Sequence, residues 1–520
     1  MNAGFESLIE PLGETDDPAE VCARFLDLPC LLFLDSAAMH SAPGARFATE
    51  PHPGQADLQR YSFLSADPVS LVQSKGGTTQ VWHRAESRWT AHSGDGLAAA
   101  RALLPTEPLP AVPGLPPFQG GLAGYIGYDW GAVLERLPQN RYDDLVIPDL
   151  VLGLYDWVIA WDHRIGTGWL ISTGLPETGP ARERQARSRL QLVRERLSAS
   201  GNSRLRPAAQ PRIAVGPLPA EIPPTYPVSG ISGEKEIGLR STFTHDGYVK
   251  AVNRVREYII SGDIFQANIS QRFESPLLQQ PFQLYRRLRR RNPAPFAAYL
   301  DFGELAILSA SPERFLRLEE PTRLVETRPI KGTRPRGLGP MHDAALGRAL
   351  AESEKDRAEN VMIVDLLRND LSRVCRAGTV RVPELFAIEQ HPTVHHLVST
   401  VLGELESGLD GTDLLRATFP GGSITGAPKV RAMEIIAELE PTKRGVYCGT
   451  IGYLSVTGAM DTSIVIRTYS ALRGQVYFQA GGGIVADSDP ELEYRETLDK
   501  ARGLMETLVE SRVASRESRT

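Results

Sequence analysis

A lysine surrounded by arginines is the residue of this chain best suited to covalent chemistry. Lys331 lies in the run from Arg328 to Arg336, which also carries three arginines and a Gly-Thr turn directly after the lysine. Neighbouring cations disfavour an ammonium group, so we expect the pKa of Lys331 to fall and a neutral, nucleophilic amine to become accessible. The alternative for such a cluster of charge is a solvated basic loop.

Two pairs of carboxylates have the spacing of neighbours on one helical face. Asp356 and Glu359 form the first pair, and Glu493 and Glu496 form the second. Like charges at this spacing repel, so each pair either faces solvent or shares a cation. Oxygen ligands of this kind suit a hard ion such as Mg²⁺.

A further carboxylate and an arginine occupy apolar surroundings. Glu313 follows an apolar strand, where partial desolvation would raise its pKa and suit it to act as a general acid; an ion pair with Arg314 or Arg317 is the alternative. Arg467 lies in the apolar run Thr462 to Thr468, predicted to be a strand. It needs an anionic partner there, either the carboxylate of a ligand or a structural salt bridge.

Two glycine-rich loops bring backbone N–H groups close to any ligand. The run Phe419 to Lys429 leads into a helix and favours an anion, but it lacks the Gly-Lys-Ser/Thr end of a nucleotide-binding loop. The run Ala480 to Asp487 is a second region of close backbone approach. His396, in a His-His pair, fits either a ligand contact or a hydrogen-bonded core histidine.

The elements that must position these residues can be read from periodicity and capping. Amphipathic or capped segments predict helices, and apolar runs with β-branched residues predict strands. The helices are expected at His245 to Ser261, Ser353 to Cys375, Ala432 to Leu439, and from Ser488 onward, and the strands at Leu150 to Trp161 (one long strand or a pair) and Ile264 to Phe273. We therefore predict an α+β fold with large, mostly antiparallel β-sheets and helices on the outside.

Composition places the chain among ordinary globular proteins of more than one domain. Its 520 residues exceed a typical single domain, and a formal net charge of −6 argues against nucleic-acid binding. The basic stretch Tyr285 to Arg291 is interpreted as a solvated helix end. A Pro/Gly/Ser-rich linker is predicted at 207–240, between an N-terminal β-rich domain at 1–206 and a catalytic domain at 241–512, with a tail at 513–520. The four scattered cysteines and the start of the chain, which lacks a signal peptide, favour a cytoplasmic protein.

Four segments together resemble one family, the chorismate-utilising enzymes, of which anthranilate synthase component I is the familiar member. The resemblance covers most of Phe243 to Glu506 and rests on the segments Lys355 to Asp370, Thr418 to Ile435, Asp461 to Arg467 and Gly481 to Lys500. The N-terminal part matches more weakly, through Leu31 to Ser36 and Gly120 to Tyr128. The resemblance implies the family's fold, a sandwich of antiparallel sheets.

Two positions distinguish branches of that family. The Pro-Ile-Lys-Gly-Thr run around Lys331 resembles the branch that aminates chorismate at C4, toward para-aminobenzoate and folate, whereas anthranilate-forming members usually carry alanine at this position. Isochorismate- and salicylate-forming relatives carry a lysine, which activates water, at the position of Gln266. A glutamine cannot act as a general base, so ammonia is the expected nucleophile.

The resemblance also implies roles for the candidate residues. Glu359 and Glu496 would ligate Mg²⁺, while Asp356 and Glu493 would hold its water ligands. Glu313 would protonate the departing 4-hydroxyl and Lys331 would attack C2, with Gln266 beside the nucleophile. The expected substrate-binding residues are Arg467, Tyr447, Gly481, Gly482 and Gly483 for the enolpyruvyl carboxylate, and His396, Thr333, Ser423 and Lys500 around the ring.

Partners and alternatives follow from the same comparison. The chain has no glutaminase signature (Gly-x-Cys-x-Gly), so the ammonia is expected from a separate glutamine amidotransferase subunit or from free ammonia. The family's tryptophan pocket would correspond to Asp35, Ser36, Pro293 and Phe296. Two alternatives remain open: amination at C2 toward anthranilate, and a non-catalytic subunit that binds tryptophan or chorismate.

Overall fold

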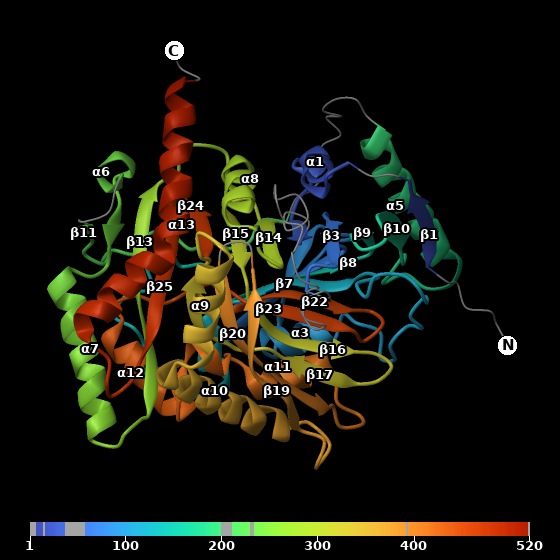
Figure 1. The fold of residues 1–520 in the computed structure, drawn as a ribbon. Helices are drawn as coiled ribbons and strands as arrows, with labels where there is room; N and C mark the ends of the chain where they lie inside the picture. The colour runs from blue at the N-terminus through green and yellow to red at the C-terminus, as the bar shows by residue number, and fades with distance from the viewer. Residues whose placement is uncertain are drawn as a thin grey trace.

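Two large antiparallel sheets form the body of the molecule (Figure 1). The computed structural model describes residues 7–13, 16–36, 58–198, 211–228, 233–391 and 394–517. Within them the first sheet has the order β1 (Leu8–Leu12), β10 (Thr167–Ser172), β9 (Trp157–Asp162), β3 (Tyr61–Ser65), β2 (Leu31–Asp35), β14 (Phe296–Asp301), β15 (Leu305–Ser311), β24 (Thr468–Leu472), β25 (Gln475–Ile484), β13 (Gln266–Pro276), β12 (Arg240–Ser241) and β11 (Tyr226–Pro227), with β21 (Gly426–Ala427) paired to β13.

The second sheet uses the remaining strands of the described chain. Its order is β18 (Ile330–Pro335), β20 (Val394–Glu404), β17 (Leu324–Thr327), β16 (Arg314–Glu319), β23 (Met460–Ile464), β22 (Thr450–Ser455), β7 (Gly121–Ile126), β8 (Leu150–Tyr155), β4 (Ser70–Lys75), β5 (Thr78–His83) and β6 (Arg88–His92), with β19 (Arg381–Gln390) paired to β20. The predicted α+β fold with large antiparallel sheets is confirmed.

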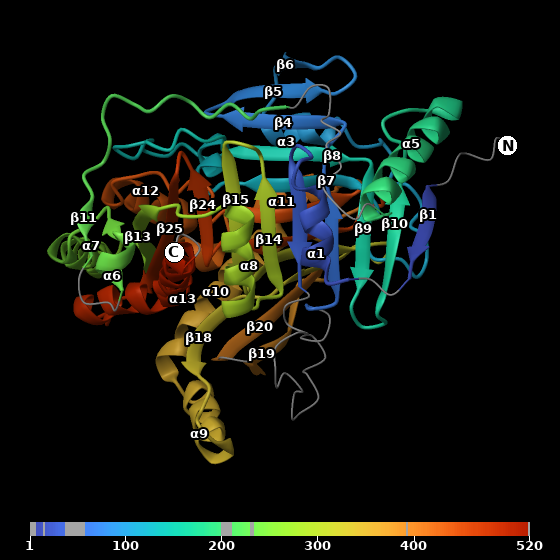
Figure 2. The same cartoon turned by 90° about the horizontal axis from the view of Figure 1, so that it is seen from above.

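Helices cover the outer faces of the two sheets (Figures 1 and 2). The longer ones are α5 (Gly179–Ser198), α7 (His245–Ile260), α8 (Pro281–Arg291), α9 (Pro340–Ala351), α10 (Glu354–Ser372), α12 (Lys429–Leu439) and α13 (Pro490–Glu517). The shorter ones are α1 (Pro18–Cys22), α3 (Gly96–Arg101), α4 (Gly131–Leu134), α6 (Glu234–Ile237) and α11 (Gly411–Thr418), with 3₁₀ turns η1 (Ala23–Phe25), η3 (Tyr128–Trp130) and η4 (Gly422–Ile424). None of the helices in the described part of the chain combines the length and apolar character that a membrane-spanning helix needs.

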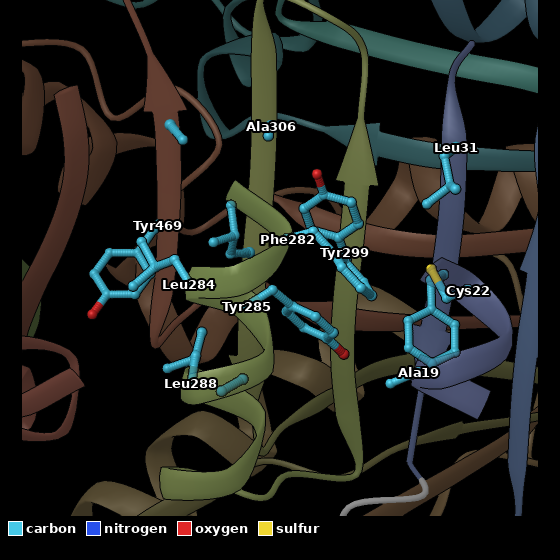
Figure 3. Packing of buried hydrophobic residues seen from close by; sticks show 14 of the residues in the cluster. Ala19, Cys22, Leu31, Phe282, Leu284, Tyr285, Leu288, Tyr299, Ala306 and Tyr469 are labelled. Carbon is cyan, nitrogen blue, oxygen red and sulfur yellow. The ribbon is translucent and has the colours of Figure 1, made fainter. Parts of the chain in front are cut away.

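The hydrophobic core lies in layers between and outside the sheets. Side chains such as Leu32 and Phe63 of the first sheet pack against Tyr125 and Val151 of the second. On the outer face of the first sheet, α8 packs Phe282, Leu284, Tyr285 and Leu288 against Tyr299 of β14 and its neighbours (Figure 3). Apolar burial on this scale is the main stabilising contribution to such a fold.

Local sequence signals located the helices that matter for the site. The helices predicted at His245, Ser353, Ala432 and Ser488 correspond to α7, α10, α12 and α13. The predicted cap of α10 is confirmed, because the Ser353 hydroxyl accepts a hydrogen bond from the backbone N–H of Asp356 at 3.3 Å.

Three local predictions need correction. The run Leu150 to Trp161 forms β8 and then β9, which belong to different sheets and do not pair. Arg467 is not inside a strand: it lies between β23 and β24 with a φ of 53°. The basic stretch Tyr285 to Arg291, expected as a solvated helix end, buries Tyr285 and Arg289, which both hold the Asp35 carboxylate.

Both sheets combine strands from either side of the predicted linker at 207–240. In the first sheet β2 pairs with β14, and in the second β7 pairs with β22. The two parts of the chain therefore share their sheets and the core between them, and the boundary at residue 207 stays a prediction.

Candidate active site

Strand β18 places Lys331 against the loop that carries Ser423. Its Nζ donates a hydrogen bond to the backbone oxygen of Ser423 at 3.0 Å. Burial lowers the pKa of Lys331, the ammonium of Lys500 lowers it further, and the carboxylates of Glu359 and Glu313 act in the opposite direction. The predicted lowering of the Lys331 pKa is confirmed, but the predicted cause, the neighbouring arginines, is wrong.

The three arginines flanking Lys331 are each paired with other groups. Arg328 binds Glu389, Arg334 lies 2.8 Å from Asp356, and Arg336 lies 2.7 Å from Asp343. Desolvation of the amine, and not repulsion by the flanking arginines, is therefore the main cause of the lowered pKa of Lys331.

Glu313 stands beside the same loop as Lys331. The residue is buried between the end of β15 and the start of β16, and burial raises its pKa to about 7. The Ser423 hydroxyl and the Lys331 ammonium oppose this shift without cancelling it. The alternative pairing is excluded for Arg314, which instead binds Asp461 and Glu326. Near pH 7 this carboxyl group can exist as a neutral acid.

Helices α10 and α13 direct the four predicted metal carboxylates toward one region. Burial raises the pKa of Glu359, and the nearby charge of Glu496 adds to that rise. Burial alone would also raise the pKa of Glu496, but the Lys500 ammonium at 2.7 Å brings it below its ordinary value. Glu493 has a raised pKa for the same reason of burial.

The donor chemistry of these carboxylates fits Mg²⁺. Among the described residues, no three acidic, histidine or cysteine side chains stand close enough together to hold a metal. Cations occupy the carboxylates instead: Lys500 binds Glu496, Lys355 lies 3.8 Å from Glu493, and Arg334 holds Asp356. Glu359, which is half-buried, has a raised pKa and makes no ion pair among the described residues, is the carboxylate that best suits a hard cation.

Strand β25 carries the three glycines against the carboxylates and Gln266. A Cβ at Gly482 would stand 2.8 Å from Glu493 Oε2, and one at Gly483 would stand 1.8 Å from Gln266 Nε2. Lys500 Nζ donates to the backbone oxygen of Gly481 at 2.8 Å. Only glycine leaves this surface open to a ligand.

Arg467 has a buried guanidinium near Tyr447 and His396. Burial lowers the pKa of Arg467, Tyr447 contributes in the opposite direction, and the structure gives Arg467 no ion pair within the described ranges. Burial also lowers the pKa of His396 well below its ordinary value, with Arg467 among the contributing cations. The neutral His396 shares a hydrogen bond of 2.9 Å with Thr333. An unpaired arginine here can bind an anion.

The glycine loop before α12 contributes Ser423, and not Lys429, to the surroundings of Lys331. Lys429 does not face a ligand, because its Nζ binds Asp370 at 2.5 Å and the Thr418 backbone oxygen at 2.8 Å. The loop instead contributes Ser423, which contacts both Lys331 and Glu313.

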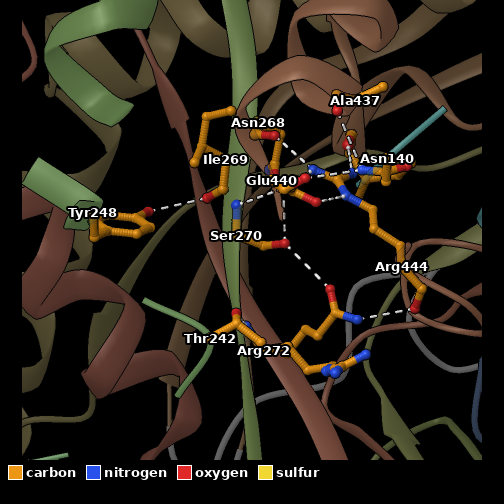
Figure 4. Close-up of polar contacts among 12 residues, drawn as sticks. Asn140, Thr242, Tyr248, Asn268, Ile269, Ser270, Arg272, Ala437, Glu440 and Arg444 are labelled. Carbon is orange, nitrogen blue, oxygen red and sulfur yellow. Dashed lines mark hydrogen bonds and ion pairs between the residues drawn. The ribbon is translucent and has the colours of Figure 1, made fainter. Parts of the chain in front are cut away.

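The ion pair between Glu440 and Arg444, which the sequence analysis did not identify, holds the loop that carries Ser423 (Figure 4). Arg444 binds Glu440 at 2.7 Å and donates to the backbone oxygens of Ile424 at 3.0 Å and Asn268 at 2.6 Å. Glu440 Oε1 also accepts from the Ser270 backbone N–H at 2.8 Å. The only sequence signal was the i,i+4 spacing of Glu440 and Arg444, which is common on exposed helices.

The residues predicted for a tryptophan pocket lie only partly around one cavity. Asp35 and Phe296 line a cavity of about 60 Å³, together with Tyr61, Phe63, Tyr453 and others. Asp35 is bound by Arg289 at 2.5 Å. Ser36 instead donates to the Tyr61 backbone oxygen at 2.7 Å, and neither it nor Pro293 lines the cavity.

Comparison with known proteins agrees with this geometry. Residues 53–506 match the model of the chorismate binding enzyme family. The chain is 44% identical to aminodeoxychorismate synthase component 1 of Salmonella typhimurium, over 88% of this chain and 92% of the relative. It is also 44% identical to anthranilate synthase component 1 of Thermus thermophilus, over 77% and 80%. The crystal structure of anthranilate synthase component I from Streptococcus pneumoniae superposes with a TM-score of 0.70 at 31% identity, covering 90% of this chain and 96% of that one.

Proposed function

Because the chain belongs to the chorismate-binding enzyme family, we propose that it is component 1 of an aminodeoxychorismate synthase. It aminates chorismate at C4 and gives 4-amino-4-deoxychorismate, the precursor of para-aminobenzoate and hence of folate. The observation that carries this proposal is the half-buried Lys331, whose lowered pKa, contact with the Ser423 loop and electrostatic interaction with Glu313 support an accessible amine near a carboxylic acid.

In the first step Lys331 acts as the nucleophile and Glu313 as the acid. The neutral amine bonds to C2, both ring double bonds shift by one position (to C1=C6 and C4=C5), and the C4–oxygen bond breaks while Glu313 gives its proton to the departing hydroxyl, which leaves as water. A group whose pKa is about 7 can donate that proton near neutral pH.

In the second step ammonia replaces the lysine. Its lone pair bonds to C4, both ring double bonds shift back, and the C2–nitrogen bond breaks, which releases Lys331 as the neutral amine. The new ammonium at C4 then returns a proton to the Glu313 carboxylate, so both residues regain their starting states. Overall, the 4-hydroxyl group of chorismate and NH₃ are converted into a 4-amino group and water, and the enolpyruvyl group stays in place.

The remaining candidate residues bind the two carboxylates and the ring. Arg467 binds the enolpyruvyl carboxylate with the help of Tyr447 and the backbone of Gly481 to Gly483. Glu359 and Glu496, with Asp356 and Glu493 behind them, would hold Mg²⁺. When bound, this ion would neutralise and orient the ring carboxylate. His396, Thr333, Ser423 and Lys500 lie around the ring.

Ammonia reaches this chain from a separate glutamine amidotransferase subunit. Support comes from the relatives, which are named as component 1, and from the absence of a glutaminase signature in the sequence. Tryptophan would occupy the cavity at Asp35 and Phe296 after that cavity widens, since about 60 Å³ is too small for an indole.

Anthranilate synthase component 1 is the second candidate, and the identity of 44% to the Thermus thermophilus relative favours it. Lys331 is the feature that distinguishes the two. Without an amine at this position, ammonia would attack C2 directly and lead toward anthranilate.

The test is product identity after incubation with chorismate, Mg²⁺ and ammonia. We expect aminodeoxychorismate from the unaltered protein, and from Lys331→Ala a loss of C4 amination with weak anthranilate formation. Lys250→Ala, at an exposed lysine of α7, serves as the matched control. Direct formation of fluorescent anthranilate by the unaltered protein, or full C4 amination by Lys331→Ala, would reject the proposal, and absence of any turnover would favour a binding subunit.

A further inference from the structure

Two amide side chains of β13 have oxygens without a hydrogen-bond donor. Gln266 is 1% exposed and Asn268 is 8% exposed, and neither Gln266 Oε1 nor Asn268 Oδ1 receives a hydrogen bond within the described residues. Leaving a buried acceptor unpaired costs about 1–3 kcal/mol, so such atoms need an explanation. A ligand that donates N–H groups would remove this cost.

The side-chain acceptors farther along the same strand are satisfied, although Arg272 Nε lacks an acceptor among the described residues. The Ser270 hydroxyl lies 2.9 Å from Glu440 and 3.3 Å from Gln479, and Arg272 binds Asp144 at 2.6 Å. Among the described residues, the unpaired side-chain acceptors of β13 are thus confined to Gln266 and Asn268 at its start.

Strand geometry puts the two amides on one face and at the site. Residues two apart on a strand point to the same side and are roughly 7 Å apart. The Gln266 amide lies against Gly483, and Asn268 is the residue paired with Gly483 across β25. The Asn268 backbone N–H donates to Thr425 at 2.7 Å, two residues from the Ser423 oxygen that Lys331 binds.

The reaction itself requires a neutral donor. Charges of both signs act on Lys331, from Lys500 and from Glu359, Glu313 and Glu496, and the Arg444 guanidinium donates to the Asn268 backbone oxygen at 2.6 Å. The Glu440 carboxylate next to them is already paired with Arg444. Ammonium has no lone pair and cannot attack carbon, whereas neutral ammonia has three N–H donors and a free lone pair. Two amide oxygens can accept two of these donors and leave the lone pair directed at carbon.

We propose that Asn268, together with Gln266, forms the site that binds and orients ammonia for attack on C4. The inference rests on the proposed function, because it assigns the nucleophile of that reaction to these two side chains. Asn268 is accordingly a specificity-determining residue toward ammonia and has no role in holding chorismate.

Steady-state kinetics with ammonia as the varied substrate test this assignment. Asn268→Leu keeps the size of the side chain but removes the acceptor, and we expect its KM for ammonia to rise about three- to tenfold, the value of one lost hydrogen bond. The KM for chorismate should stay within about twofold of the unaltered protein. Asn268→Asp retains an acceptor of the same shape and should keep the KM for ammonia closer to the original value than the leucine variant does.

Ser270→Ala is the matched control, because it removes a partnered polar group from the same strand face. It should lower the thermal midpoint but leave the ratio of the two KM values unchanged. An unchanged KM for ammonia in Asn268→Leu, or a parallel rise in both KM values, would overturn the assignment. Failure of the unaltered protein to make any C4-aminated product would instead reject the proposed function itself.

Discussion

At the scale of single residues, the candidate active site depends on burial that costs stability. The pKa of Glu313 is about 7 in the folded chain and near 4.5 when exposed, so the folded state binds the proton more tightly. The free energy of unfolding therefore falls as pH rises from about 4.5 to about 7 and changes little above that range. Because a tenfold change in proton affinity is about 1.4 kcal/mol, the penalty at high pH is at most about 3.5 kcal/mol.

Glu313→Gln should remove the loss of stability at high pH and should also remove the proton donor of the reaction. We expect a higher thermal midpoint than that of the unaltered protein at about pH 8, with a much smaller difference at about pH 4.5, and a loss of roughly 10²- to 10⁴-fold in kcat. Thermal unfolding at both pH values and single-turnover kinetics measure the two effects. A stability difference that does not change with pH would show that this carboxyl group is not the one being titrated.

Arg467 provides a second residue-scale prediction. Its guanidinium is buried and has no ion pair among the described residues, so Arg467→Met should not lower the stability of the free protein. Losing a charged hydrogen-bond donor to the substrate should raise the KM for chorismate by about 10- to 100-fold. Thermal melts and chorismate titration measure both.

The control for Arg467→Met is Arg314→Met, which breaks a buried ion pair with Asp461 and Glu326. It should destabilise the protein by about 3–5 kcal/mol. If both variants lost stability equally, Arg467 would be a structural salt-bridge residue after all.

The sequence predicted which residues have shifted pKa values better than it predicted the causes of those shifts. Lys331 and Glu313 were identified by type and position, and the directions of both pKa shifts agree. The cause assigned to Lys331 was wrong because sequence proximity of the arginines said nothing about their partners, which come from β19, α9 and α10. Arg444 was missed because its role depends on contacts with residues as distant in the chain as Asn268.

At the scale of elements, the pairing of β13 with β25 decides which glycines are structural. A Cβ at Gly481 would stand 2.4 Å from the backbone oxygen of Ile269 and 2.8 Å from the Cα of Ser270. A Cβ at Gly483 would meet the end of the Gln266 side chain, which can move. Backbone atoms cannot move aside without disturbing the hydrogen-bonded pairing of β13 with β25.

Gly481→Ala should therefore destabilise the protein by about 1–3 kcal/mol, as overpacking does. Gly483→Ala, its counterpart two residues along the strand, should change the free energy of unfolding less but displace the Gln266 amide. Denaturant unfolding of the two variants measures the difference. Equal destabilisation would mean that Gln266 is held as firmly as backbone.

Helices could be predicted more fully than strand partners. The caps of α10 and α13 and the periodicity of α7 are local signals, and they gave these helices within a few residues. The sheet change between β8 and β9 follows from long-range pairing with β7 and β3, for which a single sequence carries no local signal. The position of Arg467 between strands was missed for the same reason.

At the scale of the whole molecule, the two predicted domains are joined by shared strands. Residues on both sides of 207–240 contribute to each sheet, and the core between the sheets draws on Phe63 and Tyr125 from one side and Ile307 and Ile451 from the other. The described parts of the predicted linker, 211–228 and 233–240, contain β11, α6 and the first residue of β12. Composition cannot reveal whether the flanking parts of the chain fold separately.

Shared sheets predict a single cooperative unit. A fragment of residues 241–520 would lose the partner of β14 along β2 and the partner of β22 along β7, which exposes two strand edges and half of the core between the sheets. We expect the whole chain to unfold in one calorimetric transition and the fragment to show no cooperative transition. The site residues all lie at or beyond Gln266, so the fragment contains every proposed catalytic group and a missing activity would report on folding alone. A fragment that melts cooperatively and aminates chorismate would establish the boundary at residue 207 as a true domain boundary.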